Sequence, residues 1–183
     1  MGAALSRQIL AFARKQEFSL APVDVNDLLQ HLLPLLRATL SSTIELELTT
    51  APGLPRLQAD ANQLKQVVLN LVSNARDAVT PPGKVLIDTS LLDLDEEFVQ
   101  RNEGRPGQYV RLRVQDTGEG VPAEVLDRIF EPFFTTKTSG QGTGLGLSMV
   151  YGIVRQHGGF VQVSSLVGRG SCFEIYLPVS GEK

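Results

Sequence analysis

Apolar residues recur three or four positions apart in four segments of the chain, and this spacing predicts helices with one buried face. The segments are residues 4–16, 24–40, 60–79 and 145–157. A helix of this kind needs a second layer of structure on which to bury its apolar stripe. The stripe is clearest in the third segment, where it consists of Leu64, Val67, Val68, Leu71, Ala75 and Ala78.

Polar residues near the ends of these segments indicate where the helices begin and end. Asp24 is a suitable N-cap for the second helix, and Pro34 is expected to kink that helix or to shift its start. Asp60, with Gln63 three residues later, resembles a capping box for the third helix. His157 precedes two glycines, so we interpret it as a structural residue that caps the end of the fourth helix.

Short runs rich in apolar and β-branched residues predict strands between the helices. The last two of them form an expected hairpin around the turn sequence LVGRG. From the second helix onward, the order is helix, strand, helix, strand, strand, helix, strand, strand. This order predicts an α+β sandwich, in which helices cover one face of a mixed sheet. The expected strands are residues 42–50, 84–92, 108–116, 160–165 and 171–178.

Composition narrows the classes of function. The chain has 183 residues, of which 42% are hydrophobic and 20% are charged, and its formal net charge is −3. This charge does not favour binding to nucleic acid. Cys172 is the only cysteine, so we expect an ordinary core residue, no internal disulfide and a reducing, cytoplasmic location. No apolar run reaches the roughly 18 residues that a membrane-spanning helix needs.

Four polar residues share one face of the third predicted helix. Asn70, Ser73, Asn74 and Asp77 lie at positions i, i+3, i+4 and i+7. Asparagine is a mediocre helix former, so two asparagines one turn apart suggest a function. An amide oxygen can complete the coordination of a Mg²⁺ ion whose other ligands are phosphate oxygens and water. The alternative is a polar face that is merely solvated.

The sequence DTGEG, residues 116–120, directly follows a predicted strand. The carboxylate of Asp116 can accept a hydrogen bond from an exocyclic amine. Gly118 and Gly120 would let the backbone approach a flat ring closely. A simple Asp-Gly turn is the alternative interpretation.

Three phenylalanines and a lysine stand together in FEPFFTTK, residues 130–137, within a segment that has neither helical nor strand periodicity. Phenylalanines in such a segment need a surface on which to pack, and this suggests a closing lid. Lys137 can reach a phosphate as a point charge. An ordinary capping loop remains the alternative.

Glycines alternate with other residues at Gly142, Gly144 and Gly146, immediately before the fourth predicted helix. Glycines let backbone N–H groups converge on an anion, and the helix adds the positive end of its dipole. Leu147 replaces the last glycine of a dinucleotide-binding motif, and no Gly-Lys-Ser/Thr follows as in a Walker loop. A flexible linker is the alternative, although a linker would not need an apolar helix directly behind it.

Each motif is weak alone, but their order and chemistry fit a single ligand. Mg²⁺ at Asn74, an amine at Asp116, a lid over residues 130–141 and phosphates at residues 142–146 together describe Mg²⁺-ATP. The sequence therefore predicts an ATP site where the end of the third helix faces the start of the fourth.

The same motifs resemble those of a known family. NLVSNARDAV, DTGEG, FEPFFTTK and GTGLGLSMVYGIV are similar to the N box, first glycine box, F box and second glycine box of sensor histidine kinases. Their ATPase superfamily includes DNA gyrase, mismatch-repair ATPases and a heat-shock chaperone. The resemblance covers residues 23–178 and is greatest to cytoplasmic and hybrid kinases of bacterial two-component systems. It implies a two-layer sandwich, with three main helices on one face of a mixed, mostly antiparallel sheet and a mobile ATP lid.

The resemblance also implies roles for individual residues. Asn74 would ligate Mg²⁺ beside Asn70, Lys137 would approach the γ-phosphate, and these three residues form the implied catalytic set. Asp116 would bind the adenine amino group. The implied ATP-binding residues are Asn70, Asn74, Asp77, Asp116, Gly118, Gly120, Lys137, Gly142, Thr143, Gly144, Leu145, Gly146 and Leu147.

The residue at position 70 refines the implied mechanism. Relatives that hydrolyse ATP have a glutamate there as a general base, and the amide of Asn70 cannot take up a proton at neutral pH. The site is therefore expected to position and polarise the γ-phosphate without activating water. The nucleophile would be a histidine imidazole supplied from elsewhere.

That acceptor histidine is not evident in this sequence. The family's motif has an acidic residue after the histidine and a proline five residues on, whereas His31 is followed by two leucines and by Pro34. Residues 1–20 resemble the end of the dimerisation and phosphoacceptor hairpin, so residues 21–183 are expected to form the ATP-binding domain. Such a fragment is expected to be a monomer or weak dimer, and the full-length kinase a homodimer.

The implied partners are the missing hairpin domain and the receiver domain of a response regulator. Sensor or membrane-anchoring segments would lie upstream of Met1. Two other functions stay open: a serine kinase of the anti-sigma-factor type and a nucleotide-sensing module that transfers no phosphate. The hairpin-like N-terminal segment and the FFTTK lid argue against the serine kinase.

Overall fold

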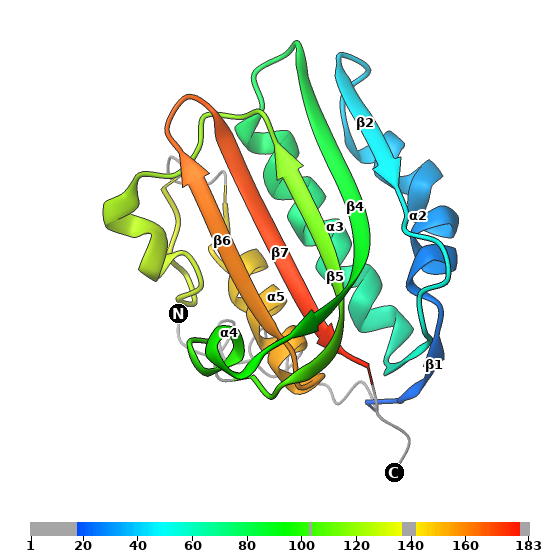
Figure 1. Ribbon diagram of the computed structural model, residues 1–183. Helices are drawn as coiled ribbons and strands as arrows, with labels where there is room; N and C mark the ends of the chain where they lie inside the picture. Colours follow the sequence, from blue (N-terminus) through cyan, green and yellow to red (C-terminus); the bar gives the residue numbers. More distant parts are fainter. Residues whose placement is uncertain (1–17, 103, 137–141, 180–183) are drawn as a thin grey trace, which may run out of the picture.

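A five-stranded sheet forms one layer of the domain, and its strands stand in the spatial order β2, β4, β5, β7, β6 (Figure 1). The computed structural model describes residues 18–102, 104–136 and 142–179. β2 runs parallel to β4, and the other neighbouring strands are antiparallel, which confirms the expected mixed, mostly antiparallel sheet. The strands are β2 (Ile44–Thr49), β4 (Gly83–Leu94), β5 (Gly107–Asp116), β6 (Phe160–Leu166) and β7 (Gly170–Pro178).

Three long helices cover the face of the sheet that points away from the viewer in Figure 1. They are α2 (Val25–Thr39), α3 (Ala61–Ala78) and α5 (Gly146–Gln156), and they confirm the expected α+β sandwich. Their apolar stripes meet the inward-facing strand residues in one core. In the part of the chain that the structure describes, no helix is long and apolar enough to cross a membrane. Fully buried core residues include Leu29, Leu36, Val67, Leu71, Ile87 and Ile175.

The start of α2 and the last hairpin agree with the sequence pattern. The Asp24 carboxylate accepts a hydrogen bond from the N–H of Asp27 at 3.0 Å, so Asp24 is the predicted N-cap. α2 begins at Val25 despite Pro34 in its interior, so the proline does not shift the helix start. β6 and β7 form the expected hairpin. The helix expected at residues 4–16 lies outside the described residues.

Only half of the capping box predicted for α3 is present. The Asp60 carboxylate caps the helix by accepting hydrogen bonds from Asn62 N–H at 2.9 Å and Gln63 N–H at 3.1 Å. The return contact from the Gln63 side chain is missing, because its Oε1 is buried and has no partner among the described residues. The backbone N–H of Asp60 donates instead to Nε2 of His157, at the far end of α5.

Four short elements were not predicted from the sequence. β1 (Ala21–Val23) pairs antiparallel with β3 (Leu57–Ala59), and strands of three residues are too short to show an alternating pattern. α4 (Glu96–Gln100) and a 3₁₀ helix (Ala123–Arg128) lie in polar segments without an apolar stripe. For α4, the sequence feature that indicates the start of the helix is Asp95, whose carboxylate accepts a hydrogen bond from the N–H of Phe98 at 2.9 Å.

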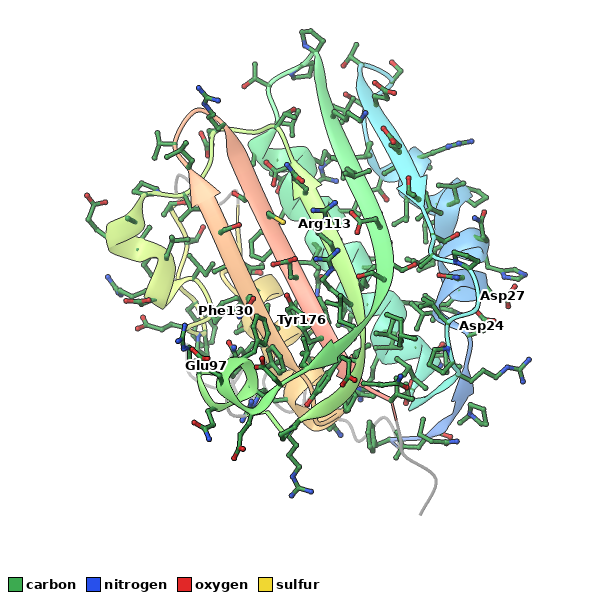
Figure 2. All side chains as sticks on the ribbon, in the orientation of Figure 1. Asp24, Asp27, Glu97, Arg113, Phe130 and Tyr176 are labelled. Carbon is green, nitrogen blue, oxygen red and sulfur yellow. The ribbon has the colours of Figure 1, made fainter. Side chains whose placement is uncertain are left out.

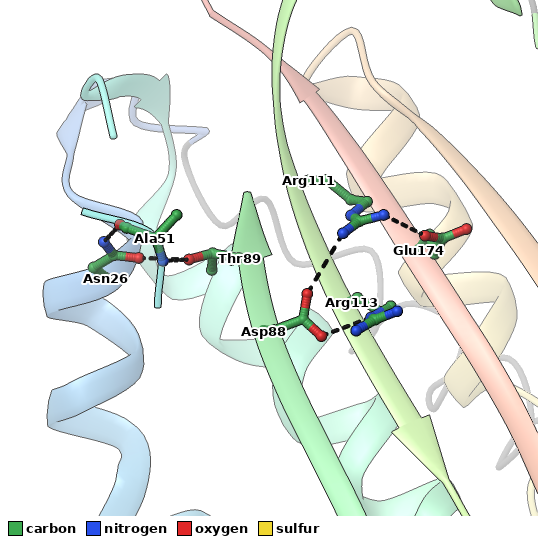
Figure 3. Close-up of polar contacts among 7 residues, drawn as sticks. All are labelled: Asn26, Ala51, Asp88, Thr89, Arg111, Arg113 and Glu174. Carbon is green, nitrogen blue, oxygen red and sulfur yellow. Dashed lines mark hydrogen bonds and ion pairs between the residues drawn. The ribbon is translucent and has the colours of Figure 1, made fainter. Parts of the chain in front are cut away.

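The face of the sheet opposite the long helices carries a ladder of paired charges (Figure 3). The buried carboxylate of Asp88 lies 2.6 Å from Nε of Arg113 and 3.6 Å from a terminal nitrogen of Arg111. Arg111 also donates to Glu174 at 3.0 Å. The hydrogen bond to Asp88 raises the pKa of Arg113. The four charges compensate one another across β4, β5 and β7, so ion pairs between neighbouring strands stabilise this face of the sheet.

One end of this second face is covered by α4 through an aromatic cluster. The rings of Phe160 and Tyr176 stack at 4.7 Å, and Phe98 of α4 lies 5.8 Å from Tyr176, which is labelled in Figure 2. Cys172 lies on the same face. The expectation that Cys172 is a core residue is wrong, because its side chain is only half-buried. Burial and the nearby Glu174 raise the pKa of its thiol, which therefore stays protonated.

Candidate functional site

A cavity of about 380 Å³ lies where the C-terminal half of α3 faces the start of α5 and the ends of β5 and β7. The fold brings residues from all four predicted motifs to this cavity. The predicted site residues that line it are Asn70, Asn74, Asp77, Asp116, Gly120, Gly142, Thr143, Gly144, Gly146 and Leu147.

Among the described residues, two predicted site residues do not line the cavity. Gly118 lies behind Asp116, where an added Cβ would be 2.6 Å from the carbonyl oxygen of Ala78, so only glycine fits. Leu145 is the N-cap residue of α5, and its N–H donates to Thr143 Oγ1 at 3.4 Å. Lys137 lies outside the described residues.

Asp116 places a buried carboxylate at the closed end of the cavity. Its side chain is 4% exposed, and Oδ1 accepts hydrogen bonds from Gly118 N–H at 2.8 Å and Ser171 N–H at 3.3 Å. Burial raises the pKa of this carboxyl group, and the two N–H donors oppose that rise. Among the described residues, no donor is found for Oδ2. That oxygen is therefore available to a donor on a ligand.

The amide face of α3 lies opposite the start of α5. Nδ2 of Asn70 donates to the Gly146 carbonyl oxygen at 3.4 Å, which fixes the distance between the two helices. Nδ2 of Asn74 is buried and has no partner among the described residues. An unsatisfied buried donor costs about 1–3 kcal/mol. At Gly146 an added Cβ would lie 3.9 Å from both Asn74 amide atoms, so the missing side chain keeps this space open.

The first turn of α5 is suited to binding an anion. α5 begins at Gly146, has no acidic residue in its first turn and receives no side-chain cap within the described residues. The first N–H groups of a helix have no partner inside the helix, and the helix dipole makes this end positive. Gly142, Thr143 and Gly144 stand directly before this end and line the cavity with it. Phosphate groups match this arrangement of donors.

Residues 130–136 are hydrogen-bonded to the glycine loop, which is the segment of residues 142–146. Phe133 has a φ of 68°, and its N–H donates to the Gly144 carbonyl oxygen at 2.9 Å. The ring of Phe130 packs on Tyr151 at 5.5 Å, and the guanidinium of Arg128 lies 4.6 Å above the ring of Phe134. Phe133 is 68% exposed. Two of the three phenylalanines therefore have the packing surface that the sequence suggested they need.

Several residues that line the cavity were not predicted from the sequence. Ser171 contributes a backbone N–H, which any residue type except proline could supply, so its sequence position carried no signal. Arg76 lies at the rim and donates to the Asp77 carboxylate at 2.7 Å and to Ser73 at 3.2 Å. An arginine beside a carboxylate on a helix could have suggested this pair. Apolar walls come from Val121, Ile129, Phe134 and Phe173.

Neither histidine lines the cavity in the part of the chain that the structure describes. His31 is exposed on α2, where Nδ1 lies 2.8 Å from the Asp27 carbonyl oxygen. His157 is the C-cap residue of α5, at the end opposite the cavity. Its Nδ1 lies 2.8 Å from the Ile153 carbonyl oxygen, as expected for a capping residue.

The site combines the buried carboxylate of Asp116, the amide face of α3 and the positive start of α5, within an α+β sandwich. This combination defines a class of adenine-nucleotide-binding domain. Residues 59–181 match the family described as "Histidine kinase-, DNA gyrase B-, and HSP90-like ATPase", and the chain belongs to this family. Within it, the chain is an ATPase domain of the sensor histidine kinase type.

Known relatives support this assignment. The chain is 45% identical over 177 residues to the sensor kinase CckA of Brucella abortus (strain 2308), with 96% of this chain and 19% of CckA covered. The structure of full-length ShkA in complex with AMPPNP matches with a TM-score of 0.75 at 34% identity, covering 96% of this chain and 35% of that chain. Histidine kinase ThkA in complex with the response regulator protein TrrA matches with a TM-score of 0.71 at 26% identity, covering 97% and 47%. The chain thus spans less than half of each of these proteins.

Replacing Asp116 tests adenine recognition. We expect Asp116→Ala to weaken ATP binding by about 10- to 100-fold, since a hydrogen bond to a charged group is lost. Binding of inorganic triphosphate should change far less, because it has no amine. Calorimetric titration of both ligands measures the difference, and thermal melting confirms that the variant is folded. Asp93→Ala, at an exposed position on β4, is the matched control. Equal losses for ATP and triphosphate would contradict the role of Asp116.

A methyl group at residue 144 tests the glycine loop. Gly144 has a φ of 65°, and an added Cβ would lie 2.4 Å from the backbone of Phe133. We therefore expect Gly144→Ala to displace the loop and weaken ATP binding by about 10-fold or more. Gly53→Ala is the control, because Gly53 has a φ of 70° but no atom near its added Cβ. This control should lose some thermal stability and keep its ATP affinity. ATP binding by Gly144→Ala that matches the control would refute the proposed steric role.

Proposed function

We propose that this domain binds Mg²⁺-ATP in the cavity and transfers the γ-phosphate to a histidine on a dimerisation and phosphoacceptor domain. The observation that carries the proposal is the alignment of Asp116, the Asn74 amide and the start of α5 along one cavity. This order of an amine acceptor, a metal-binding amide and phosphate donors follows the order of groups in Mg²⁺-ATP.

The adenine end of the nucleotide is assigned to Asp116. Its free Oδ2 would accept the hydrogen bond of the 6-amino group, while Oδ1 stays bound to Gly118 and Ser171. Gly118 and Gly120 let the backbone on either side of Glu119 pack closely on Ala78 and Leu166, which holds the turn after Asp116 in place. Phe173 and Ile129 offer apolar contacts in the same cavity.

The metal and phosphate end is assigned to α3 and α5. A Mg²⁺ ion would take the amide oxygen of Asn74 together with phosphate oxygens and water, and would neutralise phosphate charge. The Asn74 amide lines the cavity, and the absence of a side chain at Gly146 leaves space beside it for such an ion. The glycine loop and the first turn of α5 would hold the phosphates through their N–H groups. Lys137 would reach the γ-phosphate from the lid.

The site is suited to transfer to a histidine and not to water. Asn70 occupies the position where hydrolysing relatives have a general base, and an amide cannot remove a proton from water at neutral pH. A neutral imidazole nitrogen of the acceptor histidine would attack the γ-phosphorus directly. A P–N bond forms, the bond to the bridging oxygen breaks, ADP leaves with the electron pair and the imidazole proton passes to solvent.

The proposal has consequences for the larger protein. The acceptor would lie on a hairpin domain of a homodimeric kinase, with residues 1–20 belonging to that hairpin and residues 21–183 forming the ATP-binding domain. The isolated chain would be a monomer or weak dimer. The complex of ThkA with the response regulator protein TrrA supports a receiver domain as the next phosphate acceptor. A cytoplasmic location is proposed, since ATP is the phosphoryl donor.

Two other functions remain as alternatives: a serine kinase of the anti-sigma-factor type and a nucleotide sensor without transfer. A transfer assay with γ-labelled ATP separates them. The chain is mixed with the hairpin domain of a related sensor kinase or with a serine-bearing regulatory protein, and the labelled residue is identified by its acid stability. Acid-labile label on the hairpin histidine supports our proposal. Acid-stable label on serine supports the serine kinase, and binding without transfer supports the sensor.

Replacing Asn74 tests the metal ligand. We expect Asn74→Ala to reduce the Mg²⁺ dependence of ATP binding, because one oxygen ligand of the ion is lost. Titrating ATP at several Mg²⁺ concentrations measures this dependence. Asn62→Ala, at an exposed position in the first turn of the same helix, is the control and should keep the wild-type dependence. An unchanged Mg²⁺ dependence in Asn74→Ala would assign the metal to other residues.

A further inference from the structure

A polar junction lies at the end of the α3–α5 pair that is remote from the cavity. It consists of Phe18, Ser19, Asp60 and His157, which come from three separate parts of the sequence. The Asp60 N–H donates to His157 Nε2 at 2.9 Å, and the Ser19 N–H donates to Asp60 Oδ2 at 3.1 Å. The rings of Phe18 and His157 meet edge to face with centroids 5.1 Å apart. The junction thus joins the first described residues of the chain to the ends of two helices.

Both ring nitrogens of His157 have fixed roles. Nδ1 faces the Ile153 carbonyl oxygen, which can only accept, so Nδ1 carries the proton. Nε2 faces the Asp60 N–H, which can only donate, so Nε2 carries none. The imidazole is therefore held as one neutral tautomer between the two helices.

A simple helix cap would not require the contact from Nε2. The last carbonyl groups of α5 are already satisfied by Nδ1 of His157 and by the N–H groups of Gly158 and Gly159. At the start of α3, Gln63 stands where a capping box would place its partner for the Asp60 N–H, yet Gln63 Oε1 has no partner among the described residues. The Asp60 N–H is bonded to α5 instead of to its own helix.

The junction and the cavity lie at opposite ends of the same helix pair. Residue 60 meets residue 157, Gln66 contacts Met149, and Asn70 contacts Gly146, so α3 and α5 run antiparallel. Ten residues of helix separate Asp60 from Asn70, a distance of about 15 Å. A cross-link at one end of two packed helices limits how far they can slide or tilt at the other end.

We propose that His157 is a positioning residue that couples the segment entering the domain at Phe18–Ser19 to the geometry of the nucleotide cavity. This inference rests on the proposed ATP binding between α3 and α5. His157 fixes the position of α5 relative to α3 through its hydrogen bond with Asp60. Because the Asp60 carboxylate also accepts from the Ser19 N–H, a shift of the entering segment moves this contact. Because coupling is reciprocal, ATP in the cavity also tightens the junction.

Two substitutions of His157 separate this role from simple capping. His157→Asn keeps a short N–H donor for the Ile153 carbonyl oxygen but does not reach Asp60. His157→Gln is long enough to place an acceptor oxygen near the Asp60 N–H. Both variants are compared with the wild-type chain by calorimetric ATP titration with Mg²⁺, and by hydrogen exchange of the Ser19 and Asp60 amides with and without ATP. Thermal melting reports how far each variant is destabilised.

In the wild-type chain, we expect ATP to slow exchange at both amides. His157→Asn should bind ATP about five-fold more weakly or worse, and ATP should no longer protect Ser19. His157→Gln should recover most of the affinity and the protection. Asn and Gln variants that behave alike, or ATP binding that leaves both amides unchanged in the wild-type chain, would overturn the role of His157. A folded wild-type chain that does not bind ATP would overturn the proposed function as well.

Discussion

The antiparallel packing of α3 on α5 is the constraint on which the site depends. Because the helices run in opposite directions, the amide face at the end of α3 lies against the start of α5, where the first N–H groups have no partner inside the helix. Neither element could bind a nucleotide alone. The sheet beneath them adds Asp116 at the end of β5 and Ser171 at the start of β7, which line the same cavity.

The site also leaves polar groups that a purely structural domain would pair. Nδ2 of Asn74 is buried without a partner in the described parts of the chain, and burial raises the pKa of Asp116. An unpaired buried donor costs stability, which is recovered when a ligand supplies the missing contact. On the opposite face of the sheet, Asp88, Arg111 and Glu174 are paired with one another, although Nε of Arg111 has no partner among the described residues. Of the buried atoms without a partner in the described residues, Nδ2 of Asn74 is the one that lies at the cavity.

The sequence predicted the long elements and ten of the 21 described residues that line the cavity, because long helices and strands leave clear periodicities and because the motifs are dense in Asn, Asp and Gly. It failed where the signal is short or belongs to the backbone. β1 and β3 have three residues each, and Ser171 acts through its N–H. His157 was expected to cap α5, but its bond to Asp60 joins residues 97 positions apart, which no local pattern could reveal.

The most direct test of ATP binding between α3 and α5 is a calorimetric titration of the folded chain with Mg²⁺-ATP and, separately, with Mg²⁺-GTP. The 6-amino group of adenine donates to a carboxylate, whereas guanine presents a carbonyl oxygen at that position, which Asp116 would repel. We predict saturable binding of one ATP per chain and much weaker binding of GTP. A folded chain that binds neither nucleotide, or binds both equally well, would contradict a nucleotide site built on Asp116 and the α3–α5 pair.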